Sequence, residues 1–174
     1  MTNLYKLPIH EQSPKIISAV VEIPKGTSAK YEYDNDLGIF RLDRCLMSAM
    51  AYPASYGFIP STLSEDGDAL DVIVYNATPI DRGTLVECNV VGCLDMEDNG
   101  VKDYKILACP VSHIRSYTNI RDIDPMFLSV ARNFFSHYKD LEPDRSAVVV
   151  NGWVGKTQAQ RIIKESIKMC KSND

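Results

Sequence analysis

Four carboxylates lie within a short segment near the middle of the chain, directly before an apolar run. Residues 65–71 read EDGDALD and lead into the run LDVIVY at 70–75. Carboxylates this close repel one another, which costs stability unless a positive charge lies among them. Hard divalent cations meet that need because they prefer oxygen ligands, and Gly67 allows the backbone to bend so that Asp66 and Asp68 converge. The segment therefore predicts a metal site, although an acidic turn of this kind, taken alone, is more often simply solvated.

A second acidic group surrounds the turn at Asn99-Gly100. Its carboxylates, which taken alone are typical of a solvated hairpin loop, belong to Asp95, Glu97, Asp98 and Asp103. Asp103 and Lys105 are two positions apart, so their side chains would lie on the same face of a strand. One strand could therefore present an acid and a base to the same cavity.

A site that combines metal and phosphate also needs cations and hydroxyl groups for the substrate oxygens. Arginine forks suit phosphate, lysines act as point charges, and phenol groups donate hydrogen bonds while their rings pack. The candidates are Lys30, Arg44, Lys105, Lys139, Tyr52, Tyr56 and Tyr138. Taken singly, each is more often a surface cation or a core tyrosine. The histidines have no metal-ligand spacing, and we expect no catalytic role for His10, His113 or His137.

Composition places the chain among ordinary globular proteins. Its 174 residues are 45% hydrophobic and 24% charged, which suits one compact core and excludes a disordered or collagen-like chain. No apolar run approaches the roughly 20 residues that span a bilayer, and the N-terminus has no signal-peptide pattern, so we expect a cytoplasmic protein without membrane contact. The net charge of −4 argues against a nucleic-acid partner. Five cysteines without a CxxC pair predict reduced, mostly buried thiols, with Cys45 beside candidate site residues.

The elements that position these residues are predicted to be strands first and helices mostly later. Apolar or alternating runs bounded by turn residues predict strands at 16–23, 30–33, 38–42, 70–75, 85–94, 104–109 and 147–152, with a polar loop at 95–102. Asp124 and Pro125 form an N-cap and N1 pair, and apolar residues follow at helical spacing. A stripe from Ala159 to Cys170 predicts a C-terminal helix. The pattern favours a mainly β (α+β) fold, a single domain over 1–174 built as a small barrel with two helices packed outside.

Taken together and in order, the motifs resemble those of the soluble family I inorganic pyrophosphatases of bacterial type. DGDALD at 66–71 is similar to that family's aspartate motif, although Ala69 stands where the family usually has Pro or Glu. The other matches are VEIP at 21–24, KYE at 30–32, DR at 43–44, YPASYG at 52–57, VG at 91–92 leading to Asp98, Asp103 and Lys105, and HYK at 137–139. An isolated DxDxxD is weak evidence, whereas this ordered set is highly specific and covers nearly the whole chain.

The resemblance implies an OB-like five-stranded β-barrel with two flanking α-helices, and a homohexamer. It implies metal-dependent hydrolysis of inorganic diphosphate to two phosphates by direct attack of a metal-activated water. The cofactor would be Mg²⁺, with Mn²⁺ as a substitute. The metal-binding carboxylates would be Asp66, Asp71 and Asp103 for the activating ions, Asp98 for metal that arrives with substrate, and Glu22 and Glu32 in support.

The resemblance also implies the catalytic and substrate-binding residues. Asp68 would accept a hydrogen bond or the proton from the attacking water, and Tyr56, Lys30 and Arg44 would join it as catalytic residues. The phosphate groups would be bound by Lys30, Arg44, Tyr56, Lys105, Tyr138 and Lys139. Tyr52 would support the site from behind.

Two other functions remain open on the residues alone. The same carboxylates would serve a metal-dependent phosphohydrolase for an organic or nucleotide diphosphate, although the sequence shows no clear pocket for an organic group. A non-catalytic OB-fold binding module would need a basic groove with aromatic platforms, which the acidic segment does not fit. The chain has no GxxxxGK[ST] loop, which argues against a P-loop nucleotide triphosphatase.

Overall fold

A computed structural model describes residues 2–112, 117–143 and 147–173 of the chain. The described strands are β1 (Ile16–Ile23), β2 (Ala29–Asp34), β3 (Ile39–Cys45), β4 (Ser55–Phe58), β5 (Asp71–Val74), β6 (Leu85–Asp98), β7 (Val101–Lys102), β8 (Lys105–Pro110) and β9 (Val148–Gly155). The helices are α1 (Pro125–His137) and α2 (Lys156–Asn173), with short 3-10 turns η1 (Leu4–Lys6) and η2 (Ile120–Asp122).

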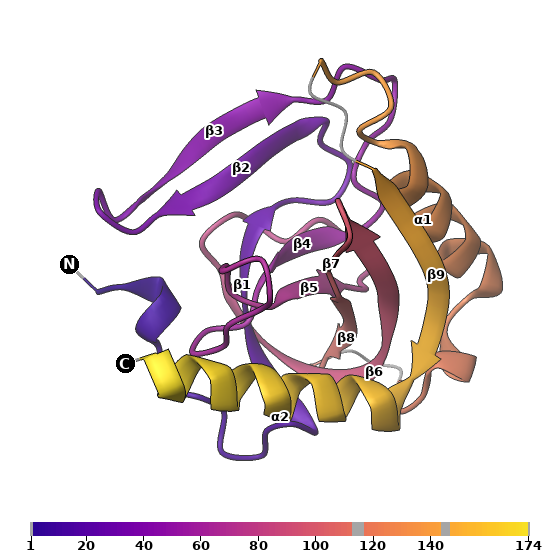
Figure 1. Cartoon of the computed structure of the whole chain (residues 1–174). Coiled ribbons are helices and arrows are strands. Elements are labelled where there is room, and N and C mark those ends of the chain that lie inside the picture. The colour runs from indigo at the N-terminus through magenta and orange to yellow at the C-terminus, as the bar shows by residue number, and fades with distance from the viewer. Residues whose placement is uncertain (1, 113–116, 144–146, 174) are drawn as a thin grey trace.

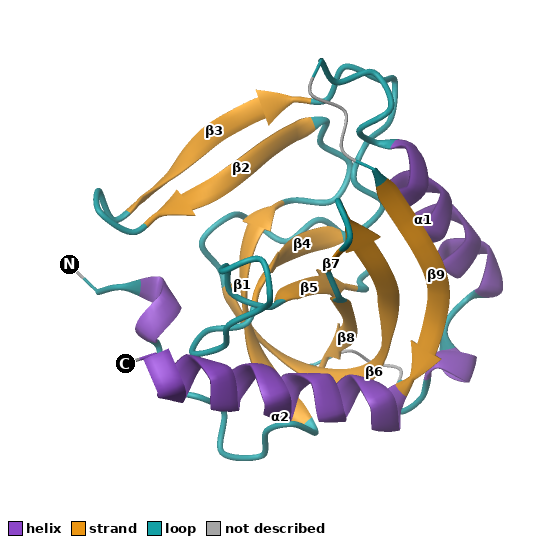
Figure 2. Ribbon diagram, in the orientation of Figure 1, coloured by secondary structure: helices purple, strands orange, loops and turns teal. Residues whose placement is uncertain are grey.

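Five of the strands close into a ring, which Figure 2 shows end-on. The strands pair in the order β1, β4, β5, β8 and β6, and β6 closes the ring by pairing with β1 from Ile16 opposite Asn89 to Val20 opposite Leu85. Within this ring β5 and β8 are parallel and the other pairs are antiparallel. The predicted OB-like five-stranded barrel is thereby confirmed.

Strand β4 was not predicted from the sequence, yet every residue in it is buried. Its four residues, Ser-Tyr-Gly-Phe, show no alternation of polar and apolar types because both faces of the strand are covered. Gly57 is required there by the close approach of β1, since a Cβ atom at that position would lie 1.8 Å from the Val20 carbonyl oxygen. Tyr56 therefore lies on a barrel strand, whereas Tyr52 lies in the segment just before it.

The predicted polar loop at 95–102 is wrong at both ends, because β6 continues through Asp98 and Val101–Lys102 form β7. This half of β6 pairs with β9, from Gly92 opposite Gly155 to Asp98 opposite Val148, and turns at Asn99 into the short β7. Pairing with a strand at least fifty residues later satisfies the backbone hydrogen bonds of a segment whose polar sequence is typical of a solvated loop. Asp98 consequently lies on a strand, not on a loose turn.

The two predicted helices pack on the outside of the barrel, as Figure 1 shows. Helix α1 begins where its cap predicts, with the Asp124 side chain accepting from the Met126 N–H at 2.9 Å. Phe134 and Phe135 of α1 are almost fully buried, and burial of such rings contributes about 1.5–3 kcal/mol each. Helix α2 buries its predicted stripe, including Ile162 and Ile163, in a core cluster separate from the one that holds Phe134 and Phe135. Within the described residues, neither helix combines the length and the apolar composition of a membrane span.

A separate two-stranded hairpin, β2 with β3, projects beside the barrel (Figure 1). Its register places Lys30 opposite Arg44 and Glu32 opposite Arg41. The hairpin follows β1 directly along the chain, so charged residues on it are carried next to the end of the barrel ring.

Candidate active site

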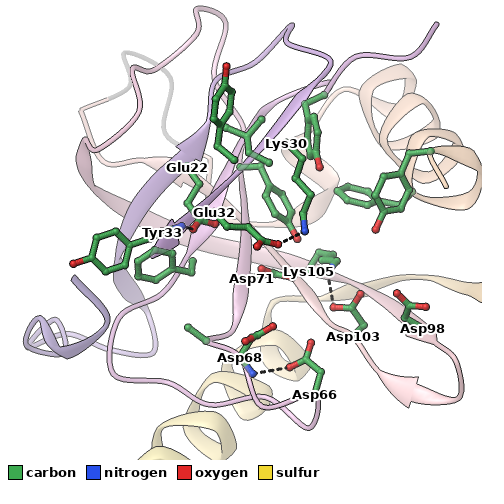
Figure 3. Close-up of a pocket in the computed structure, with 18 of the residues that line it drawn as sticks. Glu22, Lys30, Glu32, Tyr33, Asp66, Asp68, Asp71, Asp98, Asp103 and Lys105 are labelled. Atoms are coloured by element: carbon green, nitrogen blue, oxygen red, sulfur yellow. Dashed lines mark hydrogen bonds and ion pairs between the residues drawn. The ribbon is translucent and has the colours of Figure 1, made fainter. Parts of the chain in front are cut away.

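A cavity of about 390 Å³ is lined by residues from the hairpin, from the barrel strands and from the end of α1 (Figure 3). Its wall carries seven carboxylates but three ammonium groups. The carboxylates are Glu22, Glu32, Asp66, Asp68, Asp71, Asp98 and Asp103, and the ammonium groups are Lys30, Lys105 and Lys139. Segments distant in the sequence therefore meet here with an excess of negative charge.

The acidic turn before β5 bends in the way that its sequence predicts. Gly67 has a φ of +94°, and the Asp68 N–H donates to the Asp66 carboxylate at 3.0 Å. Figure 3 shows both carboxylates below the cavity, facing the end of the barrel. Partial burial, together with the charges of Asp66 and Asp71, raises the pKa of Asp68 above its usual value. Asp68 is therefore a more basic carboxylate than an ordinary surface aspartate.

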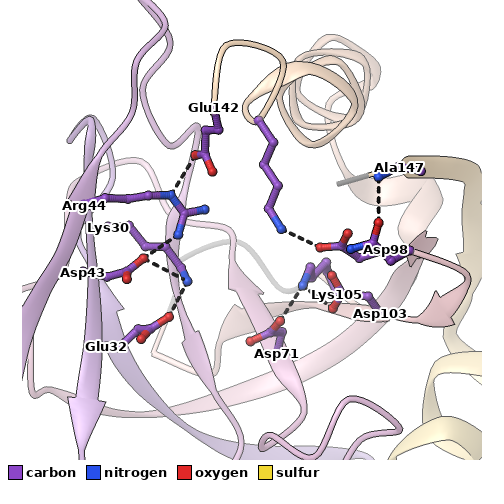
Figure 4. Close-up of polar contacts among 12 residues, drawn as sticks. Lys30, Glu32, Asp43, Arg44, Asp71, Asp98, Asp103, Lys105, Glu142 and Ala147 are labelled. Carbon is purple, nitrogen blue, oxygen red and sulfur yellow. Dashed lines mark hydrogen bonds and ion pairs between the residues drawn. The ribbon is translucent and has the colours of Figure 1, made fainter. Parts of the chain in front are cut away.

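The parallel pair of strands β5 and β8 brings an acid and a base together. Asp71 and Lys105 are the first residues of these strands and are partners in register. The Lys105 ammonium lies 2.5 Å from the Asp71 carboxylate and also donates to Asp103. Burial alone would lower the pKa of Lys105, but the charges of Asp71 and Asp103 outweigh it and raise that pKa. Lys105 is thus a buried, protonated cation, and Figure 4 shows it beside Asp71 and Asp103.

Glu22, near the end of β1, is a buried carboxylate with 7% of its surface exposed. One of its oxygens accepts the Tyr33 backbone N–H at 2.8 Å. Burial raises the pKa of Glu22 to about 8, because that hydrogen bond offsets only part of the desolvation. A cation beside Glu22 would restore its charged form near neutral pH.

The aromatic floor of the cavity consists of the tyrosines that the sequence singled out. Tyr52, Tyr56 and Tyr138 are buried and pack around Phe134 and Phe135. Burial raises the pKa of Tyr56 and of Tyr138, so their phenols stay protonated and can donate hydrogen bonds.

The cations at the rim of the cavity are held by carboxylates. Lys139, just beyond α1, lies 2.5 Å from Asp98. Lys30 on β2 donates to Glu32 and lies 3.4 Å from Asp43. Every predicted site residue lines the cavity with the exception of Arg44, which lies outside the lining and contacts two carboxylates.

The donor set fits a hard divalent cation in kind, because carboxylate oxygens are the ligands that Mg²⁺ and Mn²⁺ prefer. Within the described ranges, no three acidic, histidine or cysteine side chains already converge as a ready-made ligand set. Lys105 instead lies between Asp71 and Asp103 and balances their charge. The remaining excess of carboxylates is the feature that favours added cations.

Comparison with known proteins shows the family to which the chain belongs. The family model described as inorganic pyrophosphatase matches residues 19–171. The inorganic pyrophosphatase of Aeropyrum pernix is 40% identical over 175 residues, covering 98% of this chain and 99% of its relative. That of Campylobacter jejuni is 42% identical over 170 residues, covering 95% and 98%. The crystal structure of the Thermus thermophilus inorganic pyrophosphatase superposes with a TM-score of 0.93, at 39% identity, covering 98% of this chain and 99% of that one. The chain belongs to the inorganic pyrophosphatase family.

As an inorganic pyrophosphatase, the chain hydrolyses inorganic diphosphate to two phosphates, and family membership implies a divalent metal cofactor. The resemblance read from the ordered motifs is confirmed. The residues alone had left two other functions open, a hydrolase of organic diphosphates and a non-catalytic binding module. The comparisons favour hydrolysis of inorganic diphosphate over both.

The sequence did not predict three aromatic residues that line the pyrophosphatase cavity. Tyr5, from η1, lines it together with Tyr33 and Phe58. The Tyr5 hydroxyl donates to the Tyr33 carbonyl at 3.2 Å, and its ring lies 4.5 Å from that of Phe58. Tyr5 precedes the residues that the family model matches and belongs to no motif, so only its aromatic character could have drawn attention to it.

The described histidines lie away from the cavity lining, and three of the cysteines are buried. His137 contacts Asp140 at 2.9 Å, and neither it nor His10 lines the cavity, whereas His113 lies outside the described residues. None of the described cysteines forms a disulfide; Cys88, Cys93 and Cys109 are buried, and Cys45 is exposed on β3.

Proposed function

We propose that the cavity is the diphosphate-hydrolysing centre and that its residues act in the roles their motifs imply. The observation that supports this is the convergence, in one cavity, of acidic, basic and phenolic side chains from the β1 end, the hairpin, the acidic turn, β5, β6, β8 and the end of α1. We assign metal binding to Asp66, Asp71, Asp98 and Asp103, with Glu22 and Glu32 in support. Mg²⁺ is the proposed ion and Mn²⁺ its substitute, since both take carboxylate oxygens.

A bound divalent ion supplies positive charge that neutralises the diphosphate and lowers the pKa of water. Asp68 accepts the proton of the attacking water, a task for which its raised pKa suits it better than an ordinary aspartate. No serine or cysteine occurs among the described residues that line the cavity, which supports direct attack by water.

The substrate oxygens are bound by cations and phenols placed at fixed positions. Lys30, Lys105 and Lys139 neutralise charge, and the phenols of Tyr56 and Tyr138 donate hydrogen bonds. Such groups stabilise the charge that grows on the leaving phosphate without reorganising during the reaction. Arg44 joins them from the rim, and Tyr52 packs behind the site against Phe134.

Three further properties complete the proposal. The chain forms a single domain, supported by the barrel ring that joins β1 near one end to β6 and by α2 packing on that ring. It assembles as a homohexamer and acts in the cytoplasm without nucleic-acid or membrane partners, in keeping with its net charge of −4. Light scattering on the purified protein would test the hexamer, since a monomer at micromolar concentration would refute it.

The decisive experiment measures phosphate release from diphosphate with Mg²⁺ and with a chelator. We expect rapid release that stops on chelation and returns when Mg²⁺ is restored, with Mn²⁺ supporting lower rates. A nucleotide triphosphate serves as the control substrate and should be hydrolysed far more slowly. Folded protein, checked by circular dichroism, that releases phosphate equally well in chelator would overturn the proposed metal dependence.

A further inference from the structure

Arg44 donates hydrogen bonds to two carboxylates that come from different parts of the chain. Its Nη1 lies 2.5 Å from Asp43, its neighbour on β3, and its Nε donates to Glu142 at 2.7 Å. Arg44 and Glu142 are 98 residues apart in sequence, and only 13% of the Glu142 side chain is exposed. In the described part of the chain, the third guanidinium nitrogen, Nη2, makes no hydrogen bond or ion pair.

Glu142 also belongs to the turn that positions a cation of the cavity. Its backbone N–H donates to the Lys139 carbonyl at 3.1 Å, and the Lys139 ammonium lies 2.5 Å from Asp98. Figure 4 shows Arg44 and Glu142 on one side of a gap, with Asp98 and Lys105 across it. One turn therefore carries both the anchor of Arg44 and a phosphate-binding candidate.

The hairpin that bears Arg44 contacts the β1 end through Tyr33, and Glu142 adds a contact on the side of α1. Strands β2 and β3 form a sheet of their own and pair with no barrel strand. Charges alternate along the lip of the cavity from Glu32 through Lys30, Asp43 and Arg44 to Glu142. The first four of these side chains lie on the hairpin, so Glu142 is the member that ties the network to the α1 side of the site.

We propose that Glu142 is a positioning residue for diphosphate binding. It holds Arg44 by Nε and leaves Nη2 available to a phosphate oxygen in the gap that separates Arg44 from Asp98 and Lys105. A charge-assisted hydrogen bond fixes a guanidinium group better than a neutral contact does, and a guanidinium that is already fixed loses less freedom on binding. The inference rests on the proposed phosphate-binding role of Arg44.

Steady-state kinetics with diphosphate and Mg²⁺ test the inference. We expect Glu142→Ala to raise KM about tenfold while kcat changes much less, because the lost interaction orients a binding group. Glu142→Gln keeps an acceptor for Nε and should stay within about threefold of the wild-type KM. The matched control is Glu165→Ala, which removes an exposed ion pair with Arg161 on α2 and should leave KM unchanged.

A double-mutant cycle separates positioning from a general structural role. If Glu142 acts through Arg44, then Glu142→Ala should add little to KM in an Arg44→Ala background. Thermal unfolding of each variant identifies any loss caused by misfolding. An unchanged KM in Glu142→Ala, or an equal further loss in the Arg44→Ala background, would overturn the inference while leaving the proposed function intact. If Arg44→Ala itself has the wild-type KM, that result would refute both the phosphate-binding role of Arg44 and the inference that rests on it.

Discussion

Lys105 and Asp71 are register partners on the parallel strands β8 and β5, and the ammonium lies 2.5 Å from the carboxylate. Both residues begin their strands, and parallel strands begin at the same edge of a sheet, so the pair faces the cavity together. Asp103 accepts from the same ammonium. A single buried cation thus holds two proposed metal ligands beside each other.

Removing this cation should leave two carboxylates uncompensated in a buried setting. We expect Lys105→Met to lower the free energy of unfolding of the metal-free protein by about 3–5 kcal/mol, as for other broken buried ion pairs. Urea unfolding in chelator measures the loss. Lys102→Met, which breaks partly exposed pairs with Asp95 and Glu97, is the control and should cost much less.

Asp68 is the proposed proton acceptor, so its replacement should affect turnover rather than folding. We expect Asp68→Asn to lower kcat by at least about a hundredfold, the size of a typical general-base contribution, while the unfolding midpoint changes little. Phosphate release and thermal unfolding are measured on the same samples. Glu65→Gln changes a carboxylate of the same turn that does not line the cavity, and near-normal turnover is expected there. Turnover of Asp68→Asn close to wild type would remove Asp68 from its role.

The choice of metal should be tested with Ca²⁺. This ion is larger than Mg²⁺ and accepts looser, more variable coordination, so it should bind the carboxylates without supporting fast hydrolysis. We expect Ca²⁺ alone to give little phosphate release and, added to the Mg²⁺ enzyme, to inhibit it. Full activity in Ca²⁺ after exhaustive removal of Mg²⁺ would contradict the proposed site.

Glu22 should make the stability of the metal-free protein depend on pH. Its pKa is about 8 in the folded state against 4.5 as the ordinary value, so the folded state holds a proton that the unfolded chain releases. The stabilising effect is complete below pH 4.5 and is lost as the pH rises toward 8, with a slope of up to about 1.4 kcal/mol per pH unit.

Urea unfolding in chelator from pH 5 to pH 8 measures this slope. Glu22→Gln should flatten it, whereas Glu165→Gln on exposed α2 should not. Mg²⁺, which favours the carboxylate form, should stabilise the protein more at pH 8 than at pH 5. A slope that is the same in wild type and Glu22→Gln would show that other groups dominate.

Much of the fold was predictable because the patterns in question are local. The cap at Asp124 and Pro125 sets the start of α1, and the apolar run that leads into β5 gives a buried strand. Strand β4 was missed because both of its faces are buried, and the far half of β6 was missed because its partner, β9, lies at least fifty residues later in the chain. No local pattern reports a pairing made at that distance.

The site shows the same division between local and distant information. Asp66, Gly67 and Asp68 turn together because the bend is encoded within three residues. The place of Arg44 depends on Glu142, 98 residues away, and the contribution of Tyr5 depends on contacts with Tyr33 and Phe58. Motif spacing could nominate Arg44 as a site residue but could not show that it lies outside the cavity lining.

The closure of the barrel by β1 with β6 has a consequence for how the chain acquires activity. This pairing joins segments far apart in sequence, and such contacts form slowly because a long loop must be ordered first. Glu22, at the end of β1, and Asp98, at the end of β6, reach their common cavity only when the ring is shut. A partly folded chain with its helices already formed would therefore not hydrolyse diphosphate. The rate at which hydrolysis returns during refolding would report the rate at which the ring closes.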